Sequence, residues 1–290
     1  MGPSLVEDMK IDARSEDIKV VSCPPSWAEA KRLQQIPSTA LMPFPGGAGD
    51  SSGLRRLDPQ SNVLSPAALQ SRGVPPESDL VPGSYGGGYK VWECSFDLIE
   101  YVLASSSKIK EDMVSLSRGM RILELGCGHG LPGIASFVHL QAESLLLTDL
   151  NDGVLEDVTW PNVLLNCSNE QQQSVKCISG DWMKLPDTLR RQEGGASLLP
   201  FDLILSAETL YTEENCRSML TLLQQCLSGR AQGGVALLAN KRYYFGVGGG
   251  TSELERIADT EFPSTFRINR VKEFVDGSSN IRDILAVILA

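Results

Sequence analysis

The feature that most constrains this fold is an alternation of short apolar segments with longer amphipathic ones, which begins near residue 85. The short segments are apolar on both faces, which is typical of parallel strands that are covered on two sides. Apolar residues at helical spacing occur in 93–106 and in 211–229, where Gly229 is the expected C-cap. This pattern predicts an α/β fold with a mostly parallel sheet and helices on both faces. The predicted strands are 121–125, 144–149, 175–179, 201–206 and 234–240.

The end of the chain departs from this alternation. Residues 265–275 and 280–290 are two strand candidates, and only the short polar segment DGSSN separates them. So short a connection indicates a hairpin rather than a helical crossover. We therefore expect the sheet to end in an antiparallel C-terminal hairpin.

The first part of the chain has a different character. Residues 1–84 are punctuated by Pro and Gly, and Trp27–Gln35 is their one helical candidate. Such a composition buries little apolar surface, so we predict a largely disordered tail over 1–84 and one domain over 85–290. The alternative is a tail that drapes over the folded domain.

Charge and cysteine content exclude several classes of function. A net charge of −10 disfavours direct nucleic-acid binding. The seven cysteines include no C-x-x-C pair and the chain has two histidines, so we expect no metal site. The odd cysteine count and an N-terminus without a long apolar core indicate reduced thiols in the cytoplasm or nucleus. We expect no membrane anchor, because the apolar run 284–290 is too short to span a bilayer. We expect a monomer, since no feature of the sequence indicates an oligomer.

A glycine-rich turn joins the first predicted strand to a helix in RILELGCGHGLPG, residues 121–133. Open α/β sheets bind ligands in the crevice at the carboxyl ends of their strands, which is where this turn lies. Gly126, Gly128 and Gly130 allow unusual backbone angles and the close approach of a ligand. The turn is therefore the expected cofactor site.

Two ligand classes fit this turn. With Gly133 it satisfies the dinucleotide pattern G-x-G-x-x-G, and Asp149 follows at the distance of a ribose ligand. When Gly126 is taken as the first glycine, the turn resembles the first motif of class I S-adenosylmethionine-dependent methyltransferases. The acidic Glu124 on the strand suits a cofactor with a cationic amino-acid tail and is poorly placed against a pyrophosphate.

Further features favour the methyltransferase interpretation. The C-terminal hairpin fits a methyltransferase sheet, and no second domain follows that would bind a hydride-transfer substrate. Asp181 and Trp182 end the third strand, where the carboxylate would accept from the adenine amino group and the ring would lie nearby. Asp149 would hold the ribose hydroxyls, although taken alone it also fits a helix N-cap. We therefore expect a Rossmann-like, seven-stranded methyltransferase sheet.

More selective segments identify a branch of this superfamily. With them, Tyr85–Ala290 resembles the histidine protein methyltransferase family, whose members belong to the seven-β-strand methyltransferases. The resemblance implies methyl transfer from S-adenosylmethionine to a histidine ring nitrogen, with a large-subunit ribosomal protein as the protein substrate. The segments are GGGYKVWECSFDL (86–98), TDLND (148–152), TWPNVLLN (159–166), SAETLY (206–211) and KRYYFGVGGG (241–250).

The resemblance also implies a set of cofactor-binding residues. Two of these have a simpler alternative, because Trp92 and Cys94 also fit a packed core. His129 lies inside the glycine turn, where the superfamily tolerates many side chains, so we expect no catalytic role for it. The set is Trp92, Glu93 and Cys94 in the approach segment, Gly126 at the amino-acid tail, Asp149, Leu150 and Asn151 at the ribose, Gly180, Asp181 and Trp182 at the adenine, and Ser206 beside the cofactor.

On the acceptor side the resemblance implies Glu208 and Tyr211. Their groups would hold one ring N–H of the acceptor and so select its tautomer. The alternatives are a helix cap for Glu208 and a packed helix residue for Tyr211. The predicted substrate lip is Tyr243, Tyr244, Phe245 and Gly246, whose alternative is a tight turn with aromatic residues packed in the core.

Three other functions compete with this prediction. A lysine or small-molecule methyltransferase would share the fold. A nicotinamide-dependent dehydrogenase would share the glycine pattern. A non-catalytic binding module for ribosomal protein would keep the cofactor site without chemistry.

Overall fold

The computed structural model describes residues 18–21, 41–43, 55–57, 87–112, 119–190, 199–229, 231, 233–275 and 281–290. The predicted disordered tail and the helical candidate Trp27–Gln35 fall outside these residues, apart from three short strands. Disorder of residues 1–84 therefore stays a prediction.

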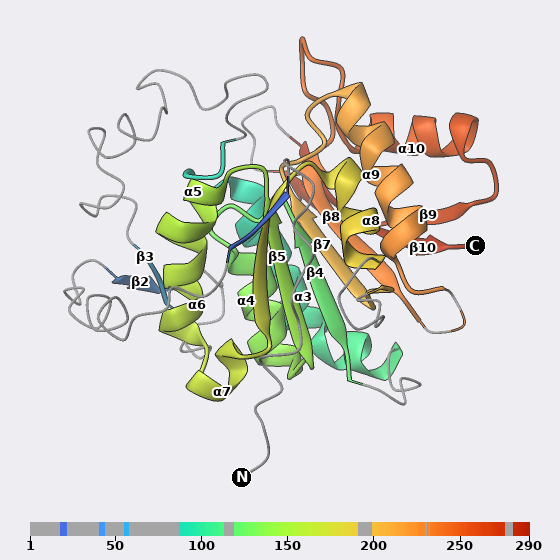
Figure 1. Ribbon diagram of the computed structural model, residues 1–290. Coiled ribbons are helices and arrows are strands. Elements are labelled where there is room, and N and C mark those ends of the chain that lie inside the picture. The colour runs from blue at the N-terminus through green and yellow to red at the C-terminus, as the bar shows by residue number, and fades with distance from the viewer. Residues whose placement is uncertain are drawn as a thin grey trace.

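A single large sheet forms the centre of the molecule (Figure 1). Its five central strands run parallel, β10 is antiparallel to β8, and β9 pairs antiparallel with β10. The predicted C-terminal hairpin pairing is therefore confirmed. In spatial order the strands are β1 (Ile18–Val21), β6 (Val175–Gly180), β5 (Ser144–Asp149), β4 (Arg121–Leu125), β7 (Leu203–Ala207), β8 (Val235–Lys241), β10 (Ile281–Leu289) and β9 (Phe266–Val275).

One strand of this sheet was not predicted. β1 comes from the N-terminal segment and pairs antiparallel with β6, from Ile18 opposite Gly180 to Val21 opposite Cys177. It adds an eighth strand beside the seven that the sequence predicts. A separate two-stranded sheet contains β2 (Leu41–Pro43) and β3 (Arg55–Leu57).

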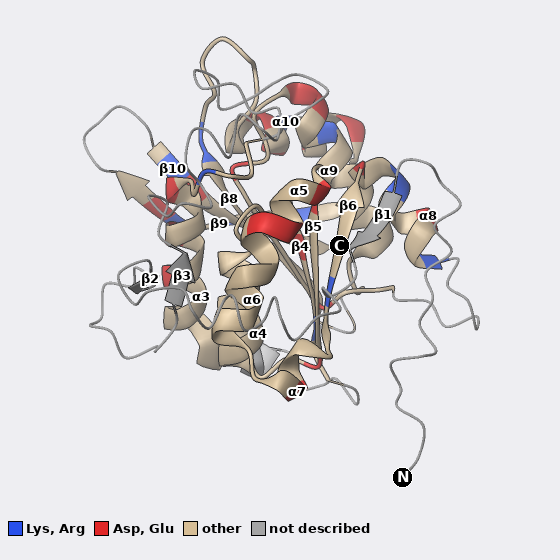
Figure 2. Cartoon of the chain, turned by 60° about the vertical axis from the view of Figure 1, so that its left-hand side comes forward, with Lys and Arg blue, Asp and Glu red and all other residues tan. Residues whose placement is uncertain are grey.

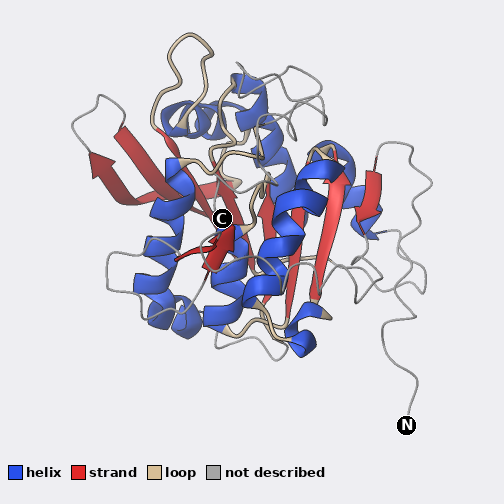
Figure 3. Cartoon of the chain, turned by 90° about the vertical axis from the view of Figure 1, so that its left-hand side faces the viewer, coloured by secondary structure: helices blue, strands red, loops and turns tan. Residues whose placement is uncertain are grey.

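Helices cover both faces of the large sheet, as the doubly apolar strands require. In Figure 2 α6 and α4 lie in front of the strands, and Figure 3 shows helices on both sides of them. One core cluster joins the sheet to α3, α4 and α6, and another joins it to α8, α9 and α10. The helices are α3 (Glu93–Asp112), α4 (Leu131–Leu140), α5 (Asp152–Val154), α6 (Trp160–Asn166), α7 (Asn169–Gln172), α8 (Leu185–Arg190), α9 (Glu213–Cys226) and α10 (Thr251–Glu261).

The end of α9 corrects one prediction. The helix stops at Cys226 and its C-cap is Leu227, so Gly229 is not the cap. Phe201 donates its amide to the Cys226 carbonyl, and the Ser228 amide donates to the Phe201 carbonyl. This pairing with the chain just before β7 draws the backbone out of the helix two residues ahead of the glycine.

Pro161 starts a helix rather than interrupting one. It lies in the first turn of α6, where a missing backbone N–H is tolerated. The preceding residues Leu155–Thr159 form a π-helical turn, η3, and such turns are frequent at functional sites. The hydroxyl of Thr159 in this turn donates to the carbonyl of Gly128, which ties η3 to the glycine turn. None of the helices in the described part of the chain is long and apolar enough to cross a membrane.

Candidate active site

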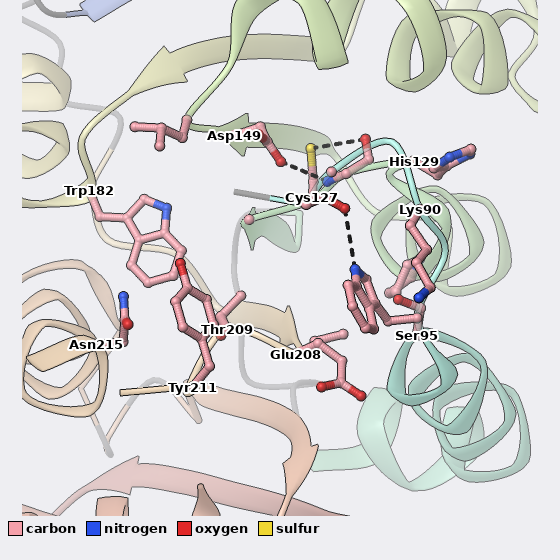
Figure 4. A pocket seen from close by; sticks show the side chains of 18 of the residues that line it. Lys90, Ser95, Cys127, His129, Asp149, Trp182, Glu208, Thr209, Tyr211 and Asn215 are labelled. Atoms are coloured by element: carbon pink, nitrogen blue, oxygen red, sulfur yellow. Dashed lines mark hydrogen bonds between the residues drawn. The ribbon is translucent and has the colours of Figure 1, made fainter. Parts of the chain in front are cut away.

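A cavity of about 300 Å³ opens at the carboxyl ends of the parallel strands (Figure 4). This volume lies at the lower end of the range for small-molecule sites. Its walls come from the segment before α3, the glycine turn after β4 and the ends of β5, β6 and β7. The parallel strands all point their carboxyl ends to the same edge, which is why residues far apart in sequence meet there.

The glycine turn and Asp149 form one wall. The Asp149 carboxylate is 5% exposed, and it accepts from the amides of Gly128 at 2.9 Å and Asn151 at 3.2 Å. Burial raises the pKa of Asp149, and these backbone donors oppose that shift. Gly126 has a φ of +61°, and a Cβ there would lie 2.8 Å from the Thr209 side chain. Position 126 therefore requires glycine, and the hydrogen bond from the Gly128 amide to Asp149 fixes the shape of the turn.

Glu124 does not lie where the methyltransferase motif predicts it, beside the amino-acid tail of a cofactor. It is 1% exposed and does not line the pocket. Its carboxyl accepts the amide of Gly133 in the first turn of α4, at 2.8 Å. A bound dinucleotide would need this helix N-terminus for its pyrophosphate, and the carboxyl already occupies it. The dinucleotide interpretation therefore has no support here.

This buried carboxyl makes stability depend on pH. Burial raises the pKa of Glu124 to about 8, the Gly133 amide opposes the shift, and Asp149 adds to it. Because unfolded chains ionise Glu near ~4.3, the folded chain keeps its proton to higher pH. The free energy of unfolding should then fall from about pH 4 to about pH 8, and Glu124→Gln should remove that decline. Urea unfolding across this range measures the effect.

The expected result is a Glu124→Gln protein that matches the unchanged chain near about pH 5 and exceeds its stability near about pH 8. The exposed Glu143→Gln is the control, and its stability curve should follow that of the unchanged chain. Parallel curves for Glu124→Gln and the unchanged chain would show that Glu124 does not titrate in this range.

The end of β6 forms another wall, where the sequence predicts adenine binding. Asp181 caps the short 3₁₀ turn η4 (Trp182–Lys184) by accepting the Met183 amide at 2.9 Å. The Trp182 ring also lines the pocket and faces the glycine turn. A Cβ built on Gly126 would lie 3.2 Å from it. A carboxylate and an indole at one strand end suit a purine with an exocyclic amine.

The approach segment closes the opposite side. Trp92 lines the pocket and donates its indole N–H to the Gly87 carbonyl at 3.2 Å. Gly88 lies so close to the glycine turn that a Cβ on Gly128 would lie 3.0 Å from the Gly88 carbonyl oxygen. A Cβ on Gly88 itself would lie 2.8 Å from Val154. Gly87, with a φ of +85°, and Gly88 therefore let this segment fold over the glycine turn.

Glu208 and Tyr211 line the pocket beyond β7. The segment is anchored by the buried side chain of Asn240, whose oxygen accepts the amides of Thr209 at 2.8 Å and Leu210 at 2.9 Å. Glu208 does not cap α9, because Thr212 is the N-cap and accepts from the Asn215 amide. Burial raises the pKa of Tyr211, and Asp149 adds to that shift, so its hydroxyl stays protonated.

The loop after β8 divides the predicted lip into two parts. Tyr243 and Phe245 are exposed by 53% and 80%, and their ring centroids lie 6.2 Å apart. Tyr244 instead turns inward and donates its hydroxyl to Glu208. Gly246 has open space around it and does not line the pocket. A docking role for the outward aromatic residues stays a prediction.

The structure thus brings half of the predicted site residues to one cavity, and the lip residues Tyr243, Tyr244, Phe245 and Gly246 do not line it. The Glu93 side chain is exposed, whereas Cys94 and Ser206 are buried in the core, and Ser206 donates its hydroxyl to the Leu125 carbonyl. These three, with Glu124, Gly130 and Asn151, do not line the pocket. The predicted residues that do line it are Trp92, Gly126, Gly128, Asp149, Leu150, Gly180, Asp181, Trp182, Glu208 and Tyr211.

Several pocket residues were missed by the sequence analysis. Lys90 and Ser95 flank Trp92, and only their nearness to the glycine-rich approach segment could have pointed to them. Asn240, which anchors the segment after β7 without lining the pocket, is a polar residue at the end of the apolar run 234–240, and that contrast was a usable signal. His129 lines the pocket as well, with its Nε2 at 3.0 Å from the Tyr89 carbonyl. Among the residues described, no three His, Cys, Asp or Glu side chains gather as a metal site.

Comparison with known proteins decides the family. A family model described as lysine methyltransferase matches residues 82–248, which is more than half of the chain. The chain belongs to this family. The cofactor of the family is the methyl donor S-adenosylmethionine.

The individual relatives of this chain are named for two different acceptor residues, histidine and lysine. A histidine protein methyltransferase 1 homolog of Dictyostelium discoideum is 37% identical over 73% of this chain and 60% of its own length. A Mus musculus protein of the same name is 29% identical over 85% of this chain and 72% of its own. A protein N-lysine methyltransferase of Danio rerio is 33% identical over 39% of this chain and 46% of its own. The chain thus spans less than two thirds of the Dictyostelium relative, and the resemblance to histidine protein methyltransferases is confirmed.

The pocket fits the cofactor of the family. Asp149 lines the pocket, and a carboxylate with about four acceptor sites can accept from a pair of ribose hydroxyls besides its backbone donors. Gly126 leaves a space that a Cβ would fill. Glu124 accepts the Gly133 amide at the start of α4, so that amide is not available to a pyrophosphate. A nucleoside that carries an amino-acid tail and no phosphate matches all three observations.

Proposed function

We propose that this chain is an S-adenosylmethionine-dependent protein methyltransferase that modifies a ring nitrogen of histidine in a large-subunit ribosomal protein. The observation that carries the proposal is the position of Glu208. Its carboxyl lies on the pocket wall at the end of β7, in the same cavity as Asp149 and the glycine turn. The proposed donor site and the residue proposed to contact the acceptor therefore line the same cavity.

Different residues would hold each part of the cofactor. Asp149 would bind the ribose hydroxyls, Asp181 and Trp182 the adenine, and the glycine turn with Trp92 the amino-acid tail. When bound, S-adenosylmethionine supplies a methyl group on a positively charged sulfur that departs without further activation. The chain therefore needs no group that generates an electrophile.

The residues of the chain would act mainly by placement. Neutral imidazole, with a reference pKa near ~6.5, is nucleophilic without a strong base. Its ring nitrogen would form a bond to the methyl carbon while the carbon–sulfur bond breaks and its electron pair stays on sulfur. The ring then carries a positive charge, and its N–H proton passes to solvent, with Glu208 as the neighbouring acceptor. Holding the ring in line and excluding water accounts for most of the expected acceleration.

Charge supports a basic protein as the partner. The chain has a net charge of −10, and Asp181 and Glu214 lie on the pocket wall. The cartoon in Figure 2 marks further acidic residues on α5 and α10. We propose that the outward rings of Tyr243 and Phe245 take part in docking beside this acidic surface, in the cytoplasm or the nucleus.

Methylation of extracted ribosomal proteins tests the proposal. The full chain is incubated with large-subunit ribosomal proteins and S-adenosylmethionine labelled in the methyl group, and the modified residue is located by mass spectrometry. The expected product is one methylhistidine in one protein. Cofactor binding without any methylhistidine would refute the proposed acceptor.

Lysine is the second acceptor to consider, because the family model carries that description and one relative is named for it. The same experiment separates the two, since acid hydrolysis of the labelled protein releases either methylhistidine or methyllysine. Methyllysine as the only product would establish the alternative.

A further inference from the structure

The charged residues on the pocket walls are mostly acidic. Among the residues that the structure describes, Lys90 is the one lysine or arginine that lines the pocket. Such walls suit the cationic groups of a ligand and repel a ligand carboxylate. S-adenosylmethionine carries both kinds of group, because its amino-acid tail ends in an ammonium and a carboxylate. The tail carboxylate therefore needs a cation on the wall. The carboxylates that line the pocket are those of Asp149, Asp181, Glu208 and Glu214.

Lys90 lies at the end of the pocket where the amino-acid tail would extend. Figure 4 shows Lys90 and Trp182 on opposite sides of the pocket, with Cys127 of the glycine turn between them. In S-adenosylmethionine the adenine and the amino-acid tail leave the ribose in opposite directions. With the adenine beside Trp182 and the ribose at Asp149, the tail would point toward Lys90.

The backbone around Lys90 is held against the cofactor wall. The amide of Lys90 and the indole N–H of Trp92 both donate to the Gly87 carbonyl, each at 3.2 Å. A Cβ on Gly88 would lie 3.2 Å from the Asp149 carboxylate, so this segment packs directly on the predicted ribose site. The position of Lys90 is therefore set by contacts that also build the pocket.

The side chain of Lys90 is held beside the pocket by an aromatic ring. Its ammonium lies 4.2 Å from the ring centroid of Trp92, and a cation over the face of an indole is attracted by the charge distribution of the ring. Trp92 itself lines the pocket, so this contact keeps the ammonium near the wall although Lys90 is an exposed residue. Because an ammonium has three N–H donors, it can bind a ligand carboxylate alongside other contacts.

We propose that Lys90 binds the carboxylate of the amino-acid tail of S-adenosylmethionine and so selects donors that carry this group. A hydrogen bond between an ammonium and a carboxylate is about twice as strong as one between neutral groups. The chain should therefore bind a decarboxylated analogue, which keeps the adenosine, the sulfur and the amine, more weakly than the complete cofactor. The inference depends on the cofactor and is independent of the proposed histidine acceptor.

Three ligands allow the inference to be tested by isothermal titration calorimetry. The first, S-adenosylhomocysteine, has the complete tail. The second, 5′-(3-aminopropylthio)adenosine, lacks only the carboxylate. The third, 5′-methylthioadenosine, lacks both the carboxylate and the amine. A contact between Lys90 and the carboxylate affects the first ligand alone.

Three variants are compared with the unchanged chain. Lys90→Met removes the charge, and Lys90→Arg keeps it. Lys272→Met is the matched control, because Lys272 is an exposed residue on β9 away from the pocket and its ammonium also lies over an aromatic ring, 5.5 Å from the centroid of Phe274. Urea unfolding shows whether each variant is folded.

For Lys90→Met we expect the affinity for S-adenosylhomocysteine to fall by at least about 10-fold, because a hydrogen bond between charged groups is lost. The affinity of Lys90→Met for the two ligands without a carboxylate should stay within about 3-fold of that of the unchanged chain. Lys90→Arg should bind S-adenosylhomocysteine within about 3-fold of the unchanged chain, since the charge remains. Lys272→Met should match the unchanged chain with all three ligands.

Two results would refute the inference. A loss for Lys90→Met that extends to the ligands without a carboxylate would show that Lys90 only shapes the pocket wall. An unchanged affinity of Lys90→Met for S-adenosylhomocysteine would place the carboxylate elsewhere. No acceptor protein takes part in these measurements, so this inference and the proposed histidine acceptor can fail separately. Absence of binding by the unchanged chain would refute the cofactor site itself, and the inference with it.

Discussion

An Asp149→Ala chain is expected to bind S-adenosylhomocysteine at least about 100-fold more weakly than the unchanged protein. The substitution removes the two hydrogen bonds that the buried carboxylate would accept from the ribose hydroxyls, each worth about 1.5–3 kcal/mol because the acceptor is charged. It also leaves the amide of Gly128 without the partner that it has at 2.9 Å. Isothermal titration calorimetry with S-adenosylhomocysteine measures the loss.

The matched control is Asp152→Ala, three residues further along the chain. Asp152 is partly exposed in the first turn of α5 and does not line the pocket, so its removal should leave the affinity within about 3-fold. Urea unfolding of both variants shows whether each is folded. A folded Asp149→Ala protein with nearly unchanged affinity would contradict the assignment of the ribose site.

A Gly249→Ala chain is expected to lose about 3 kcal/mol or more of its free energy of unfolding. A Cβ at this position would lie 2.2 Å from the Leu210 carbonyl oxygen and 2.4 Å from the Tyr211 carbonyl carbon. Both are backbone atoms that cannot rotate away. Relief of the clash requires the loop after β8 to separate from the segment that carries Glu208, so acceptor methylation should fall as well.

Gly248→Ala isolates the clash from the backbone conformation. Gly248 has a φ of +84° and nothing within 4 Å of its built Cβ, so an alanine there should cost only the left-handed strain of about 1–2 kcal/mol. Urea denaturation measures both variants. Equal losses for Gly248→Ala and Gly249→Ala would show that the close contact with Leu210 yields easily.

The strands could be predicted closely because burial on both faces leaves a direct pattern in the sequence. The segments 121–125 and 144–149 coincide with β4 and β5, and the other predicted strands shift by one or two residues. The end of α9 could not be predicted. There the pairing with Phe201, which is distant in sequence, overrides the local signal of Gly229.

The sequence predicted pocket residues well at the carboxyl ends of strands. It predicted them less well inside strands. Asp149, Asp181 and Glu208 lie at or beyond carboxyl ends, which converge on one edge of a parallel sheet. Glu124 and Ser206 lie inside their strands, where alternation directs the side chain into a packed layer. The inward turn of Tyr244 depends on hydrogen bonds within its own loop and to the segment after β7, and no local pattern encodes them.

The short strand β1 has a consequence for the integrity of the molecule. Its backbone covers the outer side of β6, opposite Gly180 at the adenine end. Cleavage anywhere between β1 and the domain would let this strand dissociate and leave a row of unsatisfied amides and carbonyls on β6. Such open edges recruit strands from other molecules and lead to aggregation. A segment more than a hundred residues away in sequence therefore protects the β6 edge of the pocket-bearing sheet from self-association.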